Sequence, residues 1–363
     1  MKKVFKNSFW FVCIMLILAA CGGGTDSTSG SSSEGSGEGD KSSGSKEKIV
    51  LKLATHEAPD AFFSSTVTVP FMERVEELTE GQVEFEFYPS QQLGNVSDYL
   101  DLTSQGVTDI AFFIPSYTSD RMPYSSSIAS FPGLISSSNQ GSNAFHELIQ
   151  QDLVLEEDYL KNGVRPLVGY VTNPYDLFST KGLVSAPDDL KGQQVRSSGA
   201  FMSALIEHFG GTPVTIATPE LYEGMEKGIV DQVAQYSTTL DSFGLGELIK
   251  YGTQGVSFGA GSCGFIINEN VWQSLPENIQ QAMLQAGKEV ADSGSKADDE
   301  QNEKILAEWS KNMEIKPLTD SEKNEWKEMF NEFNNSYVEE QKANGSNIGE
   351  VLAQYEELLG QRE

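Results

Sequence analysis

The sequence has little histidine, cysteine and positive charge. Its 363 residues include 3 His, 3 Cys and 25 Lys plus Arg against 53 Asp plus Glu, so the formal net charge is −28. Phosphate contacts require clustered Lys and Arg side chains, so this balance argues against a nucleic-acid partner. Three histidines are too few for most histidine-based metal sites, and three cysteines do not make a disulfide scaffold. We therefore predict no metal and no other cofactor.

Long hydrophobic runs are also absent, apart from one at the start of the chain. A basic start precedes an apolar run from Phe9 to Leu18, which is too short to span a bilayer comfortably and is typical of a secretory signal. The run ends in Leu-Ala-Ala-Cys at positions 18–21, which resembles the bacterial lipobox. We predict a lipoprotein signal peptide over residues 1–20 and a lipid anchor on Cys21. Ordinary signal cleavage with Cys21 as a bystander is the alternative.

Residues 21–48 join this cysteine to a segment made almost entirely of Gly, Ser, Thr, Asp, Glu and Lys. Such a composition buries too little apolar area to offset the loss of chain entropy, so it predicts a flexible tether. We therefore expect the folded body to begin at residue 49. It would be held at the extracytoplasmic face of the bacterial cell membrane through the lipid on Cys21.

The body has enough material for about two domains, since 38% of the chain is hydrophobic and 10% is aromatic. Residues 49–55 predict a strand, and apolar positions 63, 67, 71, 75 and 78 predict a helix with Pro70 in its first turn. Residues 83–88, 96–105 and 109–114 then read as strand, helix and strand. This alternation is typical of a parallel sheet, whose strands present their carboxyl ends to a ligand.

The same pattern recurs later in the chain. Residues 194–196, 213–216 and 230–235 predict strands, and residues 201–209 and 219–228 predict helices, the second with Thr218 as N-cap. Long amphipathic helices are predicted over 277–312, 320–342 and 348–359. We predict an α/β protein with lobe 1 mainly over residues 49–170 and lobe 2 mainly over 171–268, with crossing strands. Helical segments in 269–363 would pack across both lobes.

Two motifs that resemble catalytic sites fail on their spacing. The turn around Ser262 is similar to a nucleophile elbow, but all three histidines precede it, whereas hydrolases of that fold place histidine later in the chain. His146 begins a sequence that imitates a zinc-binding helix, but Gln150 stands where the second ligand belongs. We predict no catalytic residue and no enzyme activity. A secreted hydrolase on an unrecognised fold is the less favoured alternative.

Arg196 is a candidate for binding a carboxylate. It ends a predicted strand and has no acidic residue in its immediate sequence neighbourhood. Its guanidinium is a rigid fork that matches a carboxylate with two parallel charge-assisted hydrogen bonds. A surface or structural arginine is the competing interpretation, and composition alone favours it.

Five segments, in order, resemble the DctP-type substrate-binding proteins, the extracytoplasmic solute receptors of TRAP transporters. They are residues 79–94, 105–111, 130–134, 187–196 and 209–231, and the similarity covers nearly all of residues 49–360. The resemblance implies a two-lobed, periplasmic-binding-protein-like fold with hinge strands and long bracing C-terminal helices. It also implies capture of a small organic acid by lobe closure. Delivery would be to an ion-coupled permease of one small and one large membrane subunit.

The resemblance implies that Arg196 binds the ligand carboxylate. Three positions depart from the family pattern: Asp176 replaces a second arginine, Thr218 replaces an aromatic residue, and Gln235 replaces the usual asparagine. Familiar sialic-acid or dicarboxylate specificities therefore do not transfer.

Strand ends supply further candidates, including the pair at positions 56 and 57. The predicted ligand-binding residues are Arg196, Gln235, Tyr236, His56, Asn173, Tyr175, Ser116 and Thr218. The same receptor body could instead serve another transporter or a sensor kinase.

Overall fold

The computed structural model describes residues 48–360. The predicted signal peptide, the predicted lipid anchor on Cys21 and nearly all of the predicted tether lie outside these residues. Between residues 48 and 360, no helix combines the length and the apolar character needed to cross a membrane.

Five strands form the first sheet, in the order β2-β1-β3-β10-β4. β1 pairs in parallel with β2 and β3, whereas β10 runs antiparallel to β3 and β4. The helix predicted from apolar spacing is present as η1 followed by α1, and Val67, Phe71 and Val75 are fully buried on the face that the spacing predicts. The strands are β1 (Ile49–Ala54), β2 (Val83–Tyr88), β3 (Ile110–Phe113), β4 (Val164–Val171) and β10 (Ser262–Asn268).

Six strands form the second sheet, in the order β11-β9-β5-β8-β6-β7. β6 lies between β8 and β7 and is parallel to both, which is the arrangement that the second strand–helix alternation predicts. β5 is antiparallel to β8 and β9, and β11 is parallel to β9. The strands are β5 (Asp176–Ser179), β6 (Gln194–Ser197), β7 (Thr212–Thr215), β8 (Gln232–Gln235), β9 (Tyr251–Gln254) and β11 (Glu314–Pro317).

The chain passes between the two sheets along two paired segments. Residues 172–175 lead from β4 to β5, and residues 255–261 lead from β9 back to β10. Backbone hydrogen bonds join them: Thr172 N donates to Gly261 O at 2.9 Å and Tyr175 N to Gly259 O at 2.7 Å. The Asp176 carboxylate accepts from the N–H groups of Gly255 and Val256 at 2.7 and 3.2 Å. These residues form a pair of extended connecting segments that can act as a hinge.

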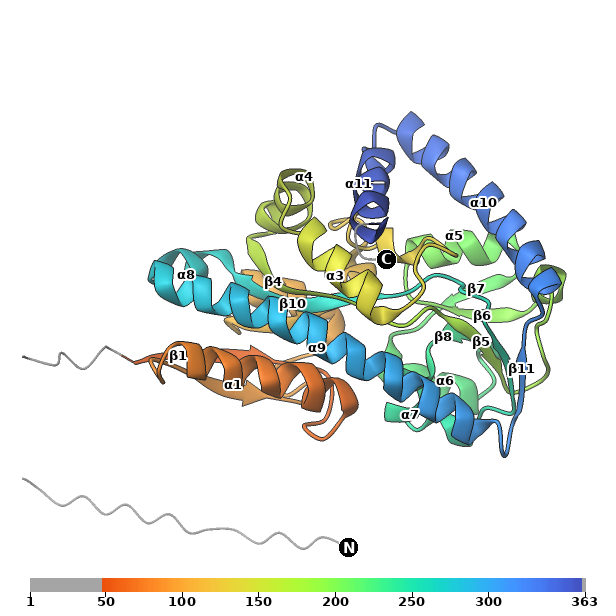
Figure 1. The fold of residues 1–363 in the computed structure, drawn as a ribbon, viewed down its shortest axis with the longest axis horizontal. Helices are drawn as coiled ribbons and strands as arrows, with labels where there is room; N and C mark the ends of the chain where they lie inside the picture. Colours follow the sequence, from red (N-terminus) through yellow and green to blue (C-terminus); the bar gives the residue numbers. More distant parts are fainter. Residues whose placement is uncertain (1–47, 361–363) are drawn as a thin grey trace, which may run out of the picture. The chain divides into compact units, whose positions relative to one another are not determined.

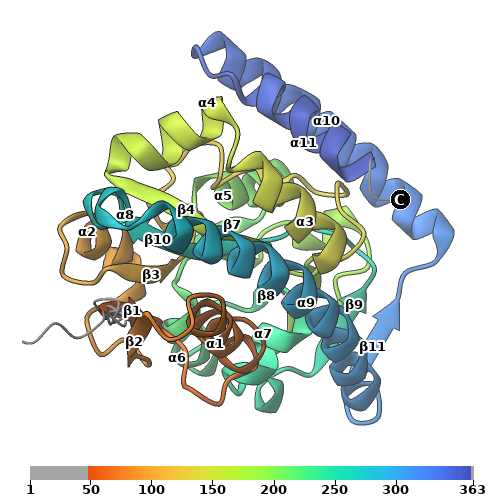
Figure 2. The ribbon, with the colours of Figure 1, turned by 60° about the vertical axis from the view of Figure 1, so that its left-hand side comes forward.

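A third connection is the 33-residue helix α9 (Glu277–Trp309), which contacts α1, α3 and β4 of the first lobe and α7 of the second (Figures 1 and 2). α10 (Asp320–Ala343) contacts the second lobe, where Trp326 Nε1 donates to Ser185 O at 3.1 Å. α11 (Ile348–Gly360) then packs on α3 of the first lobe, with Tyr355 Oη donating to Gly141 O at 3.1 Å. These contacts confirm the predicted two-lobed α/β fold with bracing C-terminal helices. The predicted residue boundaries of the lobes stay predictions.

The remaining helices are short. The α-helices are α1 (Val69–Leu78), α2 (Tyr99–Ser104), α3 (Ser138–Leu148), α4 (Asp152–Val154), α5 (Ala200–His208), α6 (Leu221–Glu226), α7 (Ser237–Ser242) and α8 (Glu269–Ser274). The other helical turns are η1 (Ser64–Thr68), η2 (Val96–Asp98), η3 (Pro115–Thr118), η4 (Ile128–Ser130), η5 (Leu155–Tyr159), η6 (Leu160–Asn162), η7 (Pro187–Leu190), η8 (Thr218–Glu220) and η9 (Leu245–Glu247).

One local prediction is wrong. Thr218 is the first residue of η8, the N-cap position belongs to Ala217, and no side chain caps this helix. The Thr218 hydroxyl instead meets Arg196 and Tyr117, whose side chains come from different lobes. Tertiary hydrogen bonds have therefore displaced the local capping interaction.

Candidate functional site

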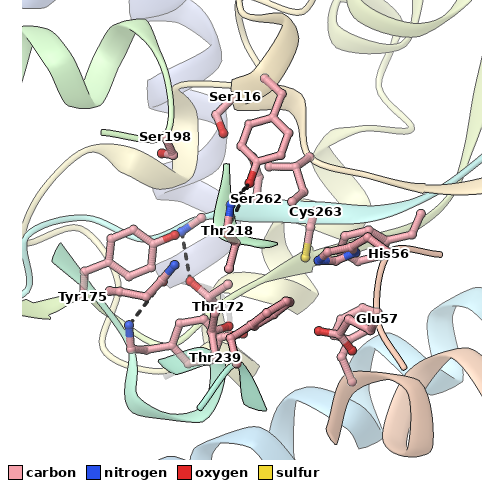
Figure 3. A pocket seen from close by; sticks show the side chains of 18 of the residues that line it. His56, Glu57, Ser116, Thr172, Tyr175, Ser198, Thr218, Thr239, Ser262 and Cys263 are labelled. Carbon is pink, nitrogen blue, oxygen red and sulfur yellow. Dashed lines mark hydrogen bonds between the residues drawn. The ribbon is translucent and has the colours of Figure 1, made fainter. Parts of the chain in front are cut away.

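A pocket lies between the lobes and is lined from both sheets (Figure 3). Its cavity has a volume of about 50 Å³. A water molecule needs about 10–15 Å³ by this measure, so the space exceeds that of a single water. Seven predicted ligand-binding residues line the pocket, namely Arg196, Gln235, Tyr236, His56, Tyr175, Ser116 and Thr218. The eighth, Asn173, lines a separate hollow together with Asp176 and Asn302.

Arg196 is the charged group on the second-lobe side of this pocket. It is the third residue of β6 and only 2% of its surface is exposed. Its Nε donates to Ile216 O at 3.1 Å, and its Nη2 donates to the Thr218 hydroxyl at 3.2 Å. No ion pair joins Arg196 to an Asp or Glu side chain in the described part of the chain. A buried guanidinium with only neutral partners leaves its charge uncompensated.

Parallel pairing of the sheet places this guanidinium at the pocket. Arg196 is in register with Val214 of β7 and Val233 of β8. The segments that follow these two neighbouring strands carry Thr218 and Gln235–Tyr236 to the same edge. Carboxyl ends of parallel strands meet at one edge, so residues far apart in the chain gather there.

The lobes touch each other beside Arg196. Tyr117, in η3 of the first lobe, accepts a hydrogen bond on Oη from Thr218 N at 2.9 Å, and the two hydroxyls lie 3.2 Å apart. The rings of His56 and Phe243, also from different lobes, stack with centroids 5.9 Å apart. These contacts describe a closed arrangement, in which Thr218 links Arg196 to the opposite lobe.

The first-lobe wall carries two adjacent titratable side chains. His56 and Glu57 directly follow β1 and are 7% and 9% exposed. Burial lowers the pKa of His56 to about 3 and raises the pKa of Glu57 to about 7. The first-lobe wall is therefore electrically neutral or weakly anionic near neutral pH, whereas the Arg196 wall is cationic.

Aromatic rings make up much of the remaining wall. Phe112 stacks on His56 with ring centroids 4.8 Å apart, and Phe63 meets Phe112 edge to face at 5.0 Å. Tyr175 and Tyr236 lie parallel on the second-lobe side, with an angle of 2° between their planes. Burial raises the pKa of Tyr175 to about 12, although the nearby Arg196 charge acts in the opposite direction. The tyrosine therefore stays a neutral hydroxyl at the guanidinium.

Sequence reasoning did not find most of these wall residues. Ring residues are far more often ordinary core residues, so their identity alone gave no signal. Tyr117 could have been found as the neighbour of Ser116 after a strand, but Phe243 follows a helix and only tertiary packing brings it to His56. The missed wall residues are Phe63, Phe112, Tyr117, Thr172, Ser198, Thr239, Phe243, Gly261, Ser262 and Cys263.

The pocket does not assemble a nucleophile with a base. Ser262 donates its hydroxyl proton to the carbonyl oxygen of Ser125, and burial raises the pKa of the Cys263 thiol well above its usual value. The thiol is buried and free, which is typical of a small apolar residue in a core. Within residues 48–360, no cluster of three or more His, Cys, Asp or Glu side chains could hold a metal ion. The arrangement is suited to binding an anion and not to a chemical step.

Comparison with known proteins gives one matching family. The family described as bacterial extracellular solute-binding protein, family 7 (DctP) matches residues 54–341. The C4-dicarboxylate-binding periplasmic protein DctP of Rhodobacter capsulatus is 24% identical over 294 residues, which cover 78% of this chain and 85% of that protein.

Two solved structures share the fold. A TRAP solute-binding protein from Rhodoferax ferrireducens, in complex with benzoate, aligns with a TM-score of 0.77 at 23% identity and covers 86% of this chain and 98% of its own. A marine metagenome TRAP solute-binding protein specific for aromatic acids, in complex with 3-hydroxybenzoate, aligns with a TM-score of 0.79 at 21% identity. The alignment covers 87% of this chain and 99% of that one.

Proposed function

Because this chain belongs to the DctP family, family 7 of the bacterial extracellular solute-binding proteins, we propose that it captures a small organic acid through Arg196. The observation that carries the proposal is the buried guanidinium without a carboxylate partner in the pocket. A ligand carboxylate would supply the missing negative charge and accept two charge-assisted hydrogen bonds. The protein is a binding protein and not an enzyme.

The pocket walls favour an acid with a flat, apolar body. Rings of Phe63, Phe112, Tyr175, Tyr236 and Phe243 surround the cavity. Aromatic side chains offer large apolar area and pair favourably with another ring, by about 0.5–1.5 kcal/mol beyond the burial of area. The related structures that hold benzoate and 3-hydroxybenzoate support the same class. We infer an aromatic or similarly planar carboxylate as the ligand.

Capture and delivery would follow from lobe closure. Closing removes water from the ion pair between Arg196 and the ligand, and a lower local dielectric strengthens it. Contacts between the lobes, such as the hydrogen bond from Thr218 N to the Tyr117 hydroxyl, exist only when the lobes are closed. The closed form therefore presents a different surface from the open form. A ligand that binds the closed form better shifts the equilibrium toward it. We propose that a TRAP-type permease of one small and one large membrane subunit recognises this form.

A thermal-shift screen of acids against their amides tests the carboxylate assignment. Benzoate, phenylacetate and their hydroxylated forms should stabilise the protein, by about 2.7 kcal/mol at 100 times Kd. Benzamide and phenylacetamide match these acids in size but carry no charge, so they should leave the melting temperature unchanged. The proposed function would be contradicted if acids and amides raised the melting temperature equally. It would also be contradicted if no organic acid in a wider panel raised it.

We also propose that a lipid on Cys21 holds the protein at the extracytoplasmic face of the cell membrane. The support is the lipobox-like sequence before Cys21 and the Gly- and Ser-rich segment after it. Cys21→Ser removes the thiol that would be acylated, so the variant should be released into the soluble fraction or remain unprocessed. Fractionation of cells with labelled fatty acid checks this. Labelled Cys21→Ser protein in the membrane would refute the anchor.

A further inference from the structure

The wall that faces Arg196 from the other lobe contains buried polar atoms without partners. Glu57 and His56 are 9% and 7% exposed, and both line the pocket. Neither Glu57 Oε2 nor His56 Nδ1 has a hydrogen-bond partner among the described residues. Buried polar atoms are nearly always paired, and an unpaired one loses the stabilisation that water gave it. Figure 3 shows both side chains on the side of the pocket away from Tyr175.

Two groups act on the Glu57 carboxyl: the backbone N–H of Ser64 forms a hydrogen bond that lowers its pKa, and the Asp298 carboxyl raises it. Asp298 of α9 is itself opposed by hydrogen bonds from the side chains of Thr238, Tyr170 and Asn173, which lower its pKa against the effect of burial. Tyr170 donates to Asp298 Oδ2 at 3.1 Å. In the described part of the chain, no Lys or Arg forms an ion pair with either carboxyl group. Burial raises the pKa of both groups to about 7.

These features define the chemistry that would satisfy this wall. A hydrogen-bond donor is what the unpaired carboxyl oxygen of Glu57 lacks, and a second anionic group there would meet this carboxyl in a dry environment. Arg196 and Glu57 line one pocket, so one molecule can meet both of them. Aromatic side chains line the same pocket, and they suit an apolar spacer.

We propose that Glu57 sets the specificity of the site by accepting a hydrogen bond from a donor group on the ligand, at the end remote from its carboxylate. This inference rests on the proposed function, because it needs a carboxylate held at Arg196. It narrows the ligand from any organic acid to an acid that also carries a hydroxyl or an ammonium group across an apolar body. It assigns a monocarboxylate, since a second carboxylate at this end would meet the Glu57 carboxyl.

Calorimetry with matched ligands tests the expected preference for a donor group in the unmodified protein. Benzoate is compared with its 2-, 3- and 4-hydroxy isomers and with 3-(aminomethyl)benzoate, and phenylacetate is compared with 3- and 4-hydroxyphenylacetate. At least one donor-bearing isomer should bind 10-fold or more tightly than its parent acid. A parent acid that binds as tightly as every substituted form overturns the role of Glu57, while leaving carboxylate binding intact.

Variants at position 57 test whether Glu57 causes the preference for donor-bearing acids. Glu57→Met keeps the length of the side chain but removes the acceptor, so the preference for a donor-bearing isomer over its parent acid should fall to less than twofold. Glu57→Gln retains an acceptor, so it should keep a hydroxyl preference but lose an ammonium preference. The two variants therefore distinguish a neutral donor from a cationic one.

Glu73→Met is the matched control, because Glu73 is an exposed carboxylate on α1 of the same lobe. It should show the preference of the unmodified protein. An undiminished preference in Glu57→Met overturns the inference. If Glu57→Met does not fold, the comparison of matched ligands in the unmodified protein still decides. Failure of all carboxylates to bind would instead refute the proposed function on which the inference rests.

Discussion

Arg196→Ala is expected to weaken binding of a carboxylate ligand by about 2–5 kcal/mol, or roughly 30- to 5,000-fold, on the scale of a broken buried charge pair. The variant loses the positive charge and leaves the ligand carboxylate desolvated without a partner. Arg196→Lys should also weaken binding, because an ammonium group does not reproduce the two parallel hydrogen bonds of the fork. Calorimetry with a carboxylate found in the thermal-shift screen measures both effects.

A second measurement separates this role from a structural one. Without ligand, Arg196 has only neutral partners, Ile216 O and the Thr218 hydroxyl. Removing an uncompensated buried charge should therefore leave the stability of the ligand-free protein unchanged or higher. A structural arginine would show the reverse: a lower melting temperature and an unchanged affinity. Arg74→Ala, which breaks surface ion pairs to Glu77 and Glu289, is the control and should bind normally.

Gly199→Ala is expected to block closure. Gly199 precedes α5 in the second lobe, and a Cβ added to it would lie 2.3 Å from the carbonyl oxygen of Ser116 in the first lobe. Its φ of 170° is extended and accessible to alanine, so the open protein carries no backbone strain. Overpacking of this kind costs about 1–3 kcal/mol. Because only the closed form meets the obstacle, affinity should fall by the same amount, roughly 5- to 150-fold.

Small-angle scattering with saturating ligand measures the closure directly. The unmodified protein should become more compact on binding, whereas Gly199→Ala should stay closer to its ligand-free dimensions. The melting temperature without ligand should change little. Gly182→Ala is the matched control, since a Cβ at Gly182 meets nothing within 4 Å. Full compaction and unchanged affinity in Gly199→Ala would show that the lobes do not need this contact.

Asp176, which stands where many family members carry a second arginine, has a role that the sequence did not predict. Its place in the pattern suggested a pocket altered by the loss of a second arginine. In the structure, Asp176 holds two backbone N–H groups of the segment that leads out of β9, and it lies outside the pocket. Burial raises its pKa to about 7, and the two hydrogen bonds oppose that rise. The residue therefore belongs to the crossing between lobes.

The positions of the Thr218 and Asn173 side chains also could not be predicted from the local sequence. Thr218 followed the local rule for a helix N-cap, but in the closed arrangement its hydroxyl is taken by Arg196 and Tyr117. Asn173 lies two residues before Tyr175, and yet the two side chains line different hollows. Along a crossing segment, the direction of each side chain depends on how the two lobes pack.

The sequence by itself determined the strands and helices of the two alternating β-α-β-α-β units and the long C-terminal helices, and its similarity to a family implied the two-lobed class. The spacing of Val67, Phe71 and Val75 involves residues that are close together in the chain. The periodicity of a helix or strand can therefore be recognised from a short stretch of sequence. Through its similarity to a family, the sequence also pointed to Arg196. The tertiary structure alone decided that this arginine is buried without a counter-ion and that His56 meets Phe243. Such contacts join residues from separate lobes, and their energies depend on burial and on three-dimensional proximity.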